Sequence, residues 1–80
     1  MIVYIPTAEN PLLGRWVEVD RPPGVKPSAV RAIWLARAKA KRAYGYAEAD
    51  CQEWAAQDVA KMLGIDPAMV RRFCRIEKIP

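Results

Sequence analysis

Arginines and lysines are the main side chains that could do chemistry in this 80-residue chain, which has 13 of them and no histidine. Without histidine, no serine or cysteine nucleophile can be activated by an imidazole base. A structural zinc site lacks its usual ligand set, because the only cysteines are Cys51 and Cys74. The glycines are isolated, so there is no glycine-rich phosphate loop, and no carboxylates pair at a recognisable acid–base spacing. We therefore expect a protein that is not an enzyme and uses no metal or cofactor.

The two cysteines also bear on the cellular compartment. They lie far apart in predicted helices, which favours two small buried thiols, with a disulfide as the alternative. No signal-peptide pattern precedes the domain, so we expect a reducing, cytoplasmic environment. No apolar run reaches the roughly 18–20 residues of a membrane helix, so no membrane partner is expected.

The basic residues are segregated along the chain, which carries a formal net charge of +4. Every charged side chain in residues 22–47 is basic. An acidic block follows, and the last segment is predominantly basic again. Such a surface favours an anionic partner, because it raises the local concentration of polyanions. The acidic block consists of Glu48, Asp50, Glu53 and Asp58, and the second basic segment contains Lys61, Arg71, Arg72, Arg75 and Lys78.

The elements that must position these charges begin with a short β element in residues 1–21. Residues 2–5 and 15–19 are strand-prone, and Asn10-Pro11 and Gly14 between them supply turn residues. A lone hairpin is marginally stable, so we expect it to pack on helices. Residues 22–28 form a connector. The apolar Tyr4, Trp16 and Trp34 are expected in the core, with a dimer surface as the alternative.

The rest of the chain predicts a mainly α domain with three helices, at about 29–45, 49–63 and 67–77. Ser28 is the expected N-cap of the first helix and Gly45 its stop. Gly64 ends the second helix, Asp66 caps the third, and Pro67 occupies its first turn. We expect one domain over 1–80. The expected buried positions are Val30, Ile33, Trp34 and Ala38, then Trp54, Val59, Ala60 and Leu63, then Val70, Phe73 and Ile76 or Cys74.

The stretch AQDVAKMLGIDPAMVRRFCR, residues 56–75, resembles the helix-turn-helix unit of bacterial and phage DNA-binding proteins. It is most similar to excisionase-type and mercury-resistance-type regulators, whose units share the phrase VAxxLGI…VRRxxR. The family pattern asks for a small residue where the helices cross and glycine at the turn, and Ala60 and Gly64 supply them. It also asks for apolar inner faces, which Val59, Leu63, Ile65, Val70 and Phe73 supply. The resemblance places a helix-turn-helix at residues 56–76.

By this resemblance, the third helix enters the major groove and its outward residues contact DNA. Arginine can bond a guanine edge or clamp a phosphate. The first helix adds a second basic surface that could approach the backbone. For both surfaces the alternative is an ordinary solvated helix face. The implied DNA-binding residues are Pro67, Ala68, Met69, Arg71, Arg72 and Arg75 on the third helix, and Arg37, Lys41 and Arg42 on the first.

The resemblance implies a small protein that binds double-stranded DNA, as a transcriptional regulator or recombination accessory factor of a phage or mobile element. One small module makes few contacts, so a homodimer or repeated sites are expected. Related domains continue into a β wing, whereas here few residues follow the third helix, and the N-terminal β element either replaces the wing or serves another purpose. The alternative is a small phage protein that binds and inhibits a host protein, of the defence or transcription machinery, because fold does not fix function.

Overall fold

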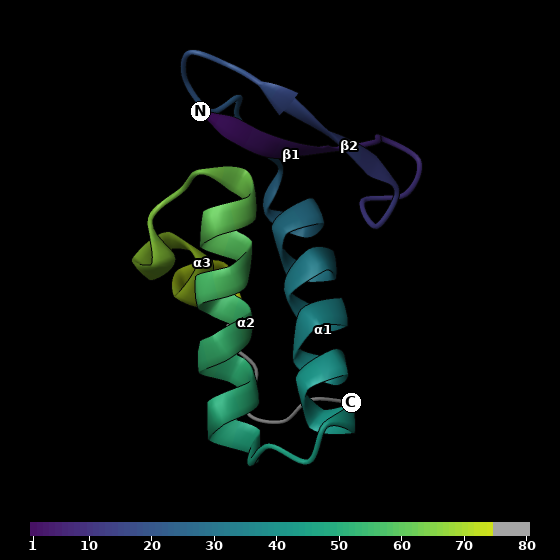
Figure 1. Cartoon of the computed structure of the whole chain (residues 1–80), viewed down its shortest axis with the longest axis vertical. Helices are drawn as coiled ribbons and strands as arrows, with labels where there is room; N and C mark the ends of the chain where they lie inside the picture. The colour runs from purple at the N-terminus through teal and green to yellow at the C-terminus, as the bar shows by residue number, and fades with distance from the viewer. Residues whose placement is uncertain (75–80) are drawn as a thin grey trace.

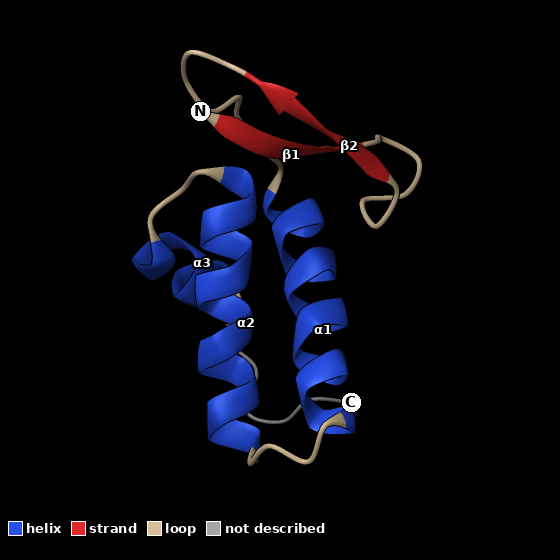
Figure 2. Ribbon diagram, viewed as in Figure 1, coloured by secondary structure: helices blue, strands red, loops and turns tan. Residues whose placement is uncertain are grey.

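Two strands followed by three helices make up the computed structural model, which describes residues 1–74. The strands form a hairpin that lies across one end of an antiparallel helix pair, and the third helix packs beside that pair (Figures 1 and 2). The predicted mainly helical fold with an N-terminal hairpin is confirmed for this part of the chain. The elements are β1 (Ile2–Pro6), β2 (Gly14–Glu18), α1 (Pro27–Ala43), α2 (Glu48–Leu63) and α3 (Pro67–Phe73).

The hairpin pairs β1 with β2 in an antiparallel register that places Tyr4 opposite Trp16. The two rings meet edge-on, with centroids 5.6 Å apart. Gly14 is required where the strands leave the turn, because a Cβ there would lie 2.3 Å from the carbonyl oxygen of Ile5. Tyr4 is buried, but Trp16 is 55% exposed, so the expected core position of Trp16 is wrong. The reason is that β1 lies against the helices while β2 faces solvent.

Helix α1 begins at Pro27, earlier than predicted. Its N-cap is Lys26, which makes no side-chain capping bond, so the prediction that Ser28 caps the helix is wrong. Proline fixes the backbone angle that the first helical position needs, and Ser28 consequently falls inside the first turn. The helix ends at Ala43, just before Gly45, whose φ is 93°. The predicted buried stripe is confirmed at Val30, Ile33, Trp34 and Ala38.

Helix α2 buries a face of mostly small residues, and its predicted stripe is wrong at Trp54, which is 49% exposed. Trp54 lies four and seven residues before Asp58 and Lys61, and therefore shares their outward side of the helix. Alanines on the inward side let the other elements approach closely. The buried residues are Cys51, Ala55, Ala56, Val59, Ala60 and Leu63.

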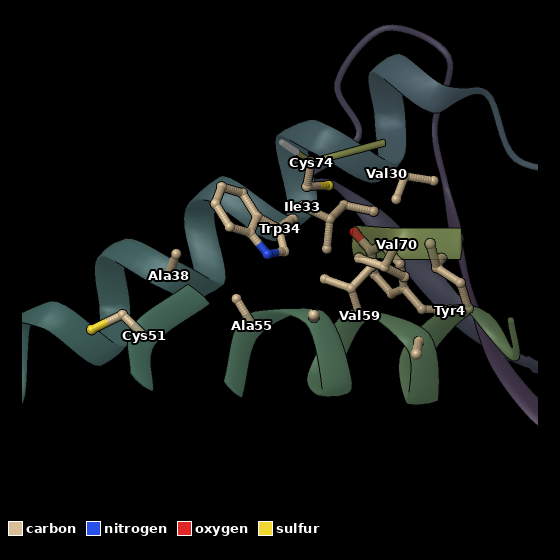
Figure 3. Close-up of a cluster of buried hydrophobic side chains, with 13 residues drawn as sticks. Tyr4, Val30, Ile33, Trp34, Ala38, Cys51, Ala55, Val59, Val70 and Cys74 are labelled. Atoms are coloured by element: carbon tan, nitrogen blue, oxygen red, sulfur yellow. The ribbon is translucent and has the colours of Figure 1, made fainter. Parts of the chain in front are cut away.

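The core is built around Trp34, which is almost fully buried between α1 and α2 (Figure 3). Its indole N–H donates a hydrogen bond of 3.3 Å to the carbonyl oxygen of Gln52, so the polar end of the ring is satisfied. Cys51 and Cys74 line the same core as free thiols, which confirms the buried-thiol prediction. Burial raises the pKa of the Cys74 thiol to about 11, so the thiol is protonated at neutral pH.

Candidate nucleic-acid interface

The turn between α2 and α3 consists of residues 64–66, and local sequence signals determine its shape. Gly64 adopts a left-handed conformation with φ of 68°, which ends α2. The side chain of Asp66 accepts a 2.9 Å hydrogen bond from the backbone N–H of Ala68 and caps α3. Pro67 occupies the first turn of α3, where its missing N–H costs nothing. All three predictions about this turn are confirmed.

Helix α3 is fixed by one fully buried side chain, Val70, and by the half-buried Ile65 and Phe73 beside it. Anchoring this side turns the opposite side to solvent. The predicted outward residues Ala68, Met69, Arg71 and Arg72 are exposed, whereas Pro67 is half-buried. The predicted Arg75 and Ile76 lie outside the described residues.

The C-terminal end of α3 differs from the prediction, because the helix ends at Phe73 rather than at 77. Cys74 has non-helical backbone angles, with φ of −114° and ψ of 43°. The guanidinium of Arg31, on α1, donates bonds of 3.2 and 3.1 Å to the carbonyl oxygen of Phe73. A side chain from another element thus binds a carbonyl at the end of this helix.

Arg71 does not point freely into solvent, because it forms an ion pair with Glu53 on α2. Its Nε donates a 3.1 Å hydrogen bond to Oε2 of Glu53, and its Nη2 bonds the other carboxylate oxygen. Gln57 donates a further hydrogen bond of 3.1 Å to Glu53. The bonds from Arg71, and then that from Gln57, hold the pKa of Glu53 below its usual range. Arg71 can therefore present its Nε and Nη2 together to a phosphate or a guanine only after releasing Glu53.

Arg72 is the arginine of α3 that is ready to bind an anion. It is exposed, and it makes no hydrogen bond or ion pair with any other residue in 1–74. A guanidinium carries five N–H donors that match the oxygens of a phosphate or the edge of a guanine. Arg72 gives the outward side of α3 its positive charge, together with Arg71 when Arg71 is released from Glu53.

Two of the predicted basic residues of α1, Arg37 and Lys41, make their contacts away from α3. Arg31 marks the flank of α1 that contacts α3, and Arg37 lies about 120° around the helix from it. Arg37 instead donates a 3.3 Å hydrogen bond to the sulfur of Met62. The ammonium of Lys41 lies 5.1 Å from the ring centre of Trp54 and 5.9 Å from that of a loop tyrosine, Tyr46.

Arg42 is exposed at the end of α1, where it has an interaction of its own. The structure thus divides the predicted set: Arg71 and Arg72 lie together on α3, and Arg37 and Lys41 contact α2 and the loop before it.

Sequence reasoning missed two residues that shape this surface. Glu53 lies 18 positions before Arg71, and Arg31 lies 42 positions before Phe73. Such long separations along the chain give no periodic or capping signal in the sequence. Both contacts form only when α3 packs on the helix pair. Trp54 was predicted to be buried, but its spacing to Asp58 and Lys61 is a sequence signal that could have identified its exposed position.

Within residues 1–74 the structure contains no helix long and apolar enough to cross a bilayer. In the same residues, no three potential metal-binding side chains of cysteine, aspartate or glutamate lie close enough together to hold an ion. Comparisons of the chain with protein-family models, with curated proteins and with solved structures find no match. The candidate interface therefore rests on the residues and geometry of this chain alone.

Proposed function

We propose that this chain is a small helix-turn-helix protein that binds double-stranded DNA through the outward side of α3. The observation that carries the proposal is the pair Arg71 and Arg72, held outward on a helix whose opposite side is fixed by buried Val70. The three-residue turn with a left-handed glycine is of the kind that joins the two helices of such a unit.

The two arginines have different roles in this proposal. Arg72 contacts a phosphate or a guanine edge directly. Arg71 releases Glu53 when a phosphate arrives, and the loss is small because both side chains are about half exposed. Ala68 and Met69, toward the N-terminal end of α3, lie against the bases through apolar contacts, for example with thymine methyl groups.

The number of contacts limits what one copy can do. A single small module buries less surface on DNA than a specific complex usually needs, so specific binding requires a dimer or repeated sites. A transcriptional regulator or a recombination accessory factor of a phage or mobile element would suit such a protein, because both act at repeated or palindromic sites.

The test is a titration of a fluorescent random-sequence duplex, followed by anisotropy over a range of salt concentrations. The wild type should bind with a steep salt dependence, and Arg71→Ala/Arg72→Ala should reduce the slope of log K against log salt by about 1 per lost phosphate contact. The control Arg21→Ala/Lys26→Ala removes the same charge from the segment between β2 and α1 and should leave the slope nearly unchanged. Absence of binding at low salt, or equal losses in both double variants, would overturn the proposal.

A further inference from the structure

A groove runs between the hairpin and the flank of α1 that faces away from α3. Its volume is about 360 Å³. Leu12 and Trp16 form its wall on the hairpin side, Ala36, Arg37 and Ala40 its wall on α1, and Met62 contributes from α2. We call this concave surface the hairpin groove.

The hairpin groove is open because small side chains line α1 opposite large ones. Ala36 and Ala40 leave room that longer side chains would fill, while Leu12 and Trp16 remain 53% and 55% exposed. The hairpin wall keeps its shape without a bound partner, because Tyr4 makes two contacts within the hairpin. Its ring meets that of Trp16 edge-on, and its hydroxyl donates a 3.1 Å hydrogen bond to the carbonyl oxygen of Pro11. Exposed apolar side chains around a concave surface are typical of an interaction site.

Arg37 gives the hairpin groove its charge. It is the only charged residue of the lining, and within residues 1–74 its guanidinium donates one hydrogen bond, to the sulfur of Met62. A thioether is a weak acceptor, so most of the five donors remain available. Arg37 is exposed, and a carboxylate seated in the groove would pair with its guanidinium through charge-assisted hydrogen bonds.

We propose that the hairpin groove docks an acidic amphipathic helix of a partner protein, with aliphatic side chains between Leu12 and Trp16 and a carboxylate on Arg37. Helices bind such grooves through apolar anchors spaced by three or four residues. A nucleic acid fits less well, because it would bring phosphates but no aliphatic anchor. This inference goes beyond DNA binding, since the groove and α3 lie on different flanks of α1 and could be occupied together.

The test is a titration of ¹⁵N-labelled full-length protein with two amphipathic helical peptides that share their leucine positions and differ only in carrying glutamate or lysine. The acidic peptide should shift the resonances of Leu12, Trp16, Arg37 and Met62, and the basic peptide should not. Arg37→Gln should weaken the acidic peptide by about fivefold or more. The control Lys39→Gln removes the same charge from another side of α1 and should change the affinity by less than about twofold.

Three outcomes would overturn the proposal. If Arg37→Gln and Lys39→Gln lost the same affinity for the acidic peptide, binding would reflect general charge attraction and not the groove. Shifts of the groove resonances on raising the protein concentration alone would assign the groove to a second copy of this chain. The same shifts on adding duplex DNA would assign it to nucleic acid. Arg72→Gln separates the two proposals, because it should weaken the binding of duplex DNA and leave the affinity for the acidic peptide unchanged.

Discussion

At the scale of single residues, the pair of Arg71 and Glu53 controls how much positive charge α3 presents. The carboxylate orients the guanidinium and partly neutralises it, so the surface is less basic than a count of arginines suggests. Neither partner is buried, so an approaching phosphate can replace the carboxylate. Arg72 has no such competitor among the described residues and remains available throughout.

The Glu53 carboxylate should make stability depend on pH. Its pKa is lower in the folded chain than its ordinary value of 4.5. The stabilisation is therefore fully present above about 4.5 and is lost as the pH falls through the lower folded value. Urea denaturation at neutral and acidic pH should show a smaller acid-induced loss for Glu53→Gln than for the wild type. The control Glu9→Gln, at an exposed position of the hairpin loop, should retain the wild-type dependence, and a loss that is equal in both variants would contradict the role of the ion pair.

At the scale of elements, what could be predicted depended on how local the cause was. The hairpin, the Asp66 cap, Pro67 and Gly64 are fixed by neighbouring residues, and the structure confirms each of them. The predicted Ser28 cap is wrong, because α1 begins at Pro27 and Ser28 already lies inside its first turn.

Other features depended on packing between distant segments and left no signal in the sequence. Trp16 is exposed because only β1 lies against the helices. The bonds of Arg31 to Phe73 and of Arg71 to Glu53 require α3 to be in place already. The positive charge on α3 follows from its own sequence and could be predicted. Its partial neutralisation by Glu53 depends on how α3 packs on α2 and could not be predicted.

Gly64 should be the most sensitive position of the α2–α3 turn. An alanine would have to adopt a left-handed backbone, at a cost of about 1–2 kcal/mol. Its Cβ would also lie 3.1 Å from side-chain atoms of Met1, Val3 and Pro22, which dock the hairpin on the helix pair. We expect Gly64→Ala to lower the unfolding free energy by at least about 1 kcal/mol in urea denaturation.

The control for this prediction is Gly24→Ala in the connector, where an added Cβ would meet nothing within 4 Å. Its stability should stay close to that of the wild type or rise slightly, because alanine narrows the unfolded ensemble. A Gly64→Ala protein as stable as the Gly24→Ala protein would show that neither the left-handed turn nor the hairpin contact constrains this position.

At the scale of the whole molecule, the chain presents two surfaces of different character. One is the charged outward side of α3, and the other is the apolar hairpin groove with Arg37 on the opposite flank of α1. Composition and periodicity were enough to predict a mainly helical fold with an N-terminal hairpin. The separation of the surfaces could not be predicted, because it follows from which flank of α1 receives α3 and which faces the hairpin.

The most direct test of the central claim, that α3 binds DNA, compares Glu53→Gln with Glu9→Gln in the salt-dependent duplex titration. Both variants remove one negative charge, but only the first frees Arg71. DNA binding through α3 predicts that Glu53→Gln binds duplex more tightly than Glu9→Gln, because Arg71 no longer has to release a carboxylate before it contacts a phosphate, and that adding Arg71→Gln abolishes this gain. Equal affinities for the two variants, or weaker binding by Glu53→Gln, would contradict it.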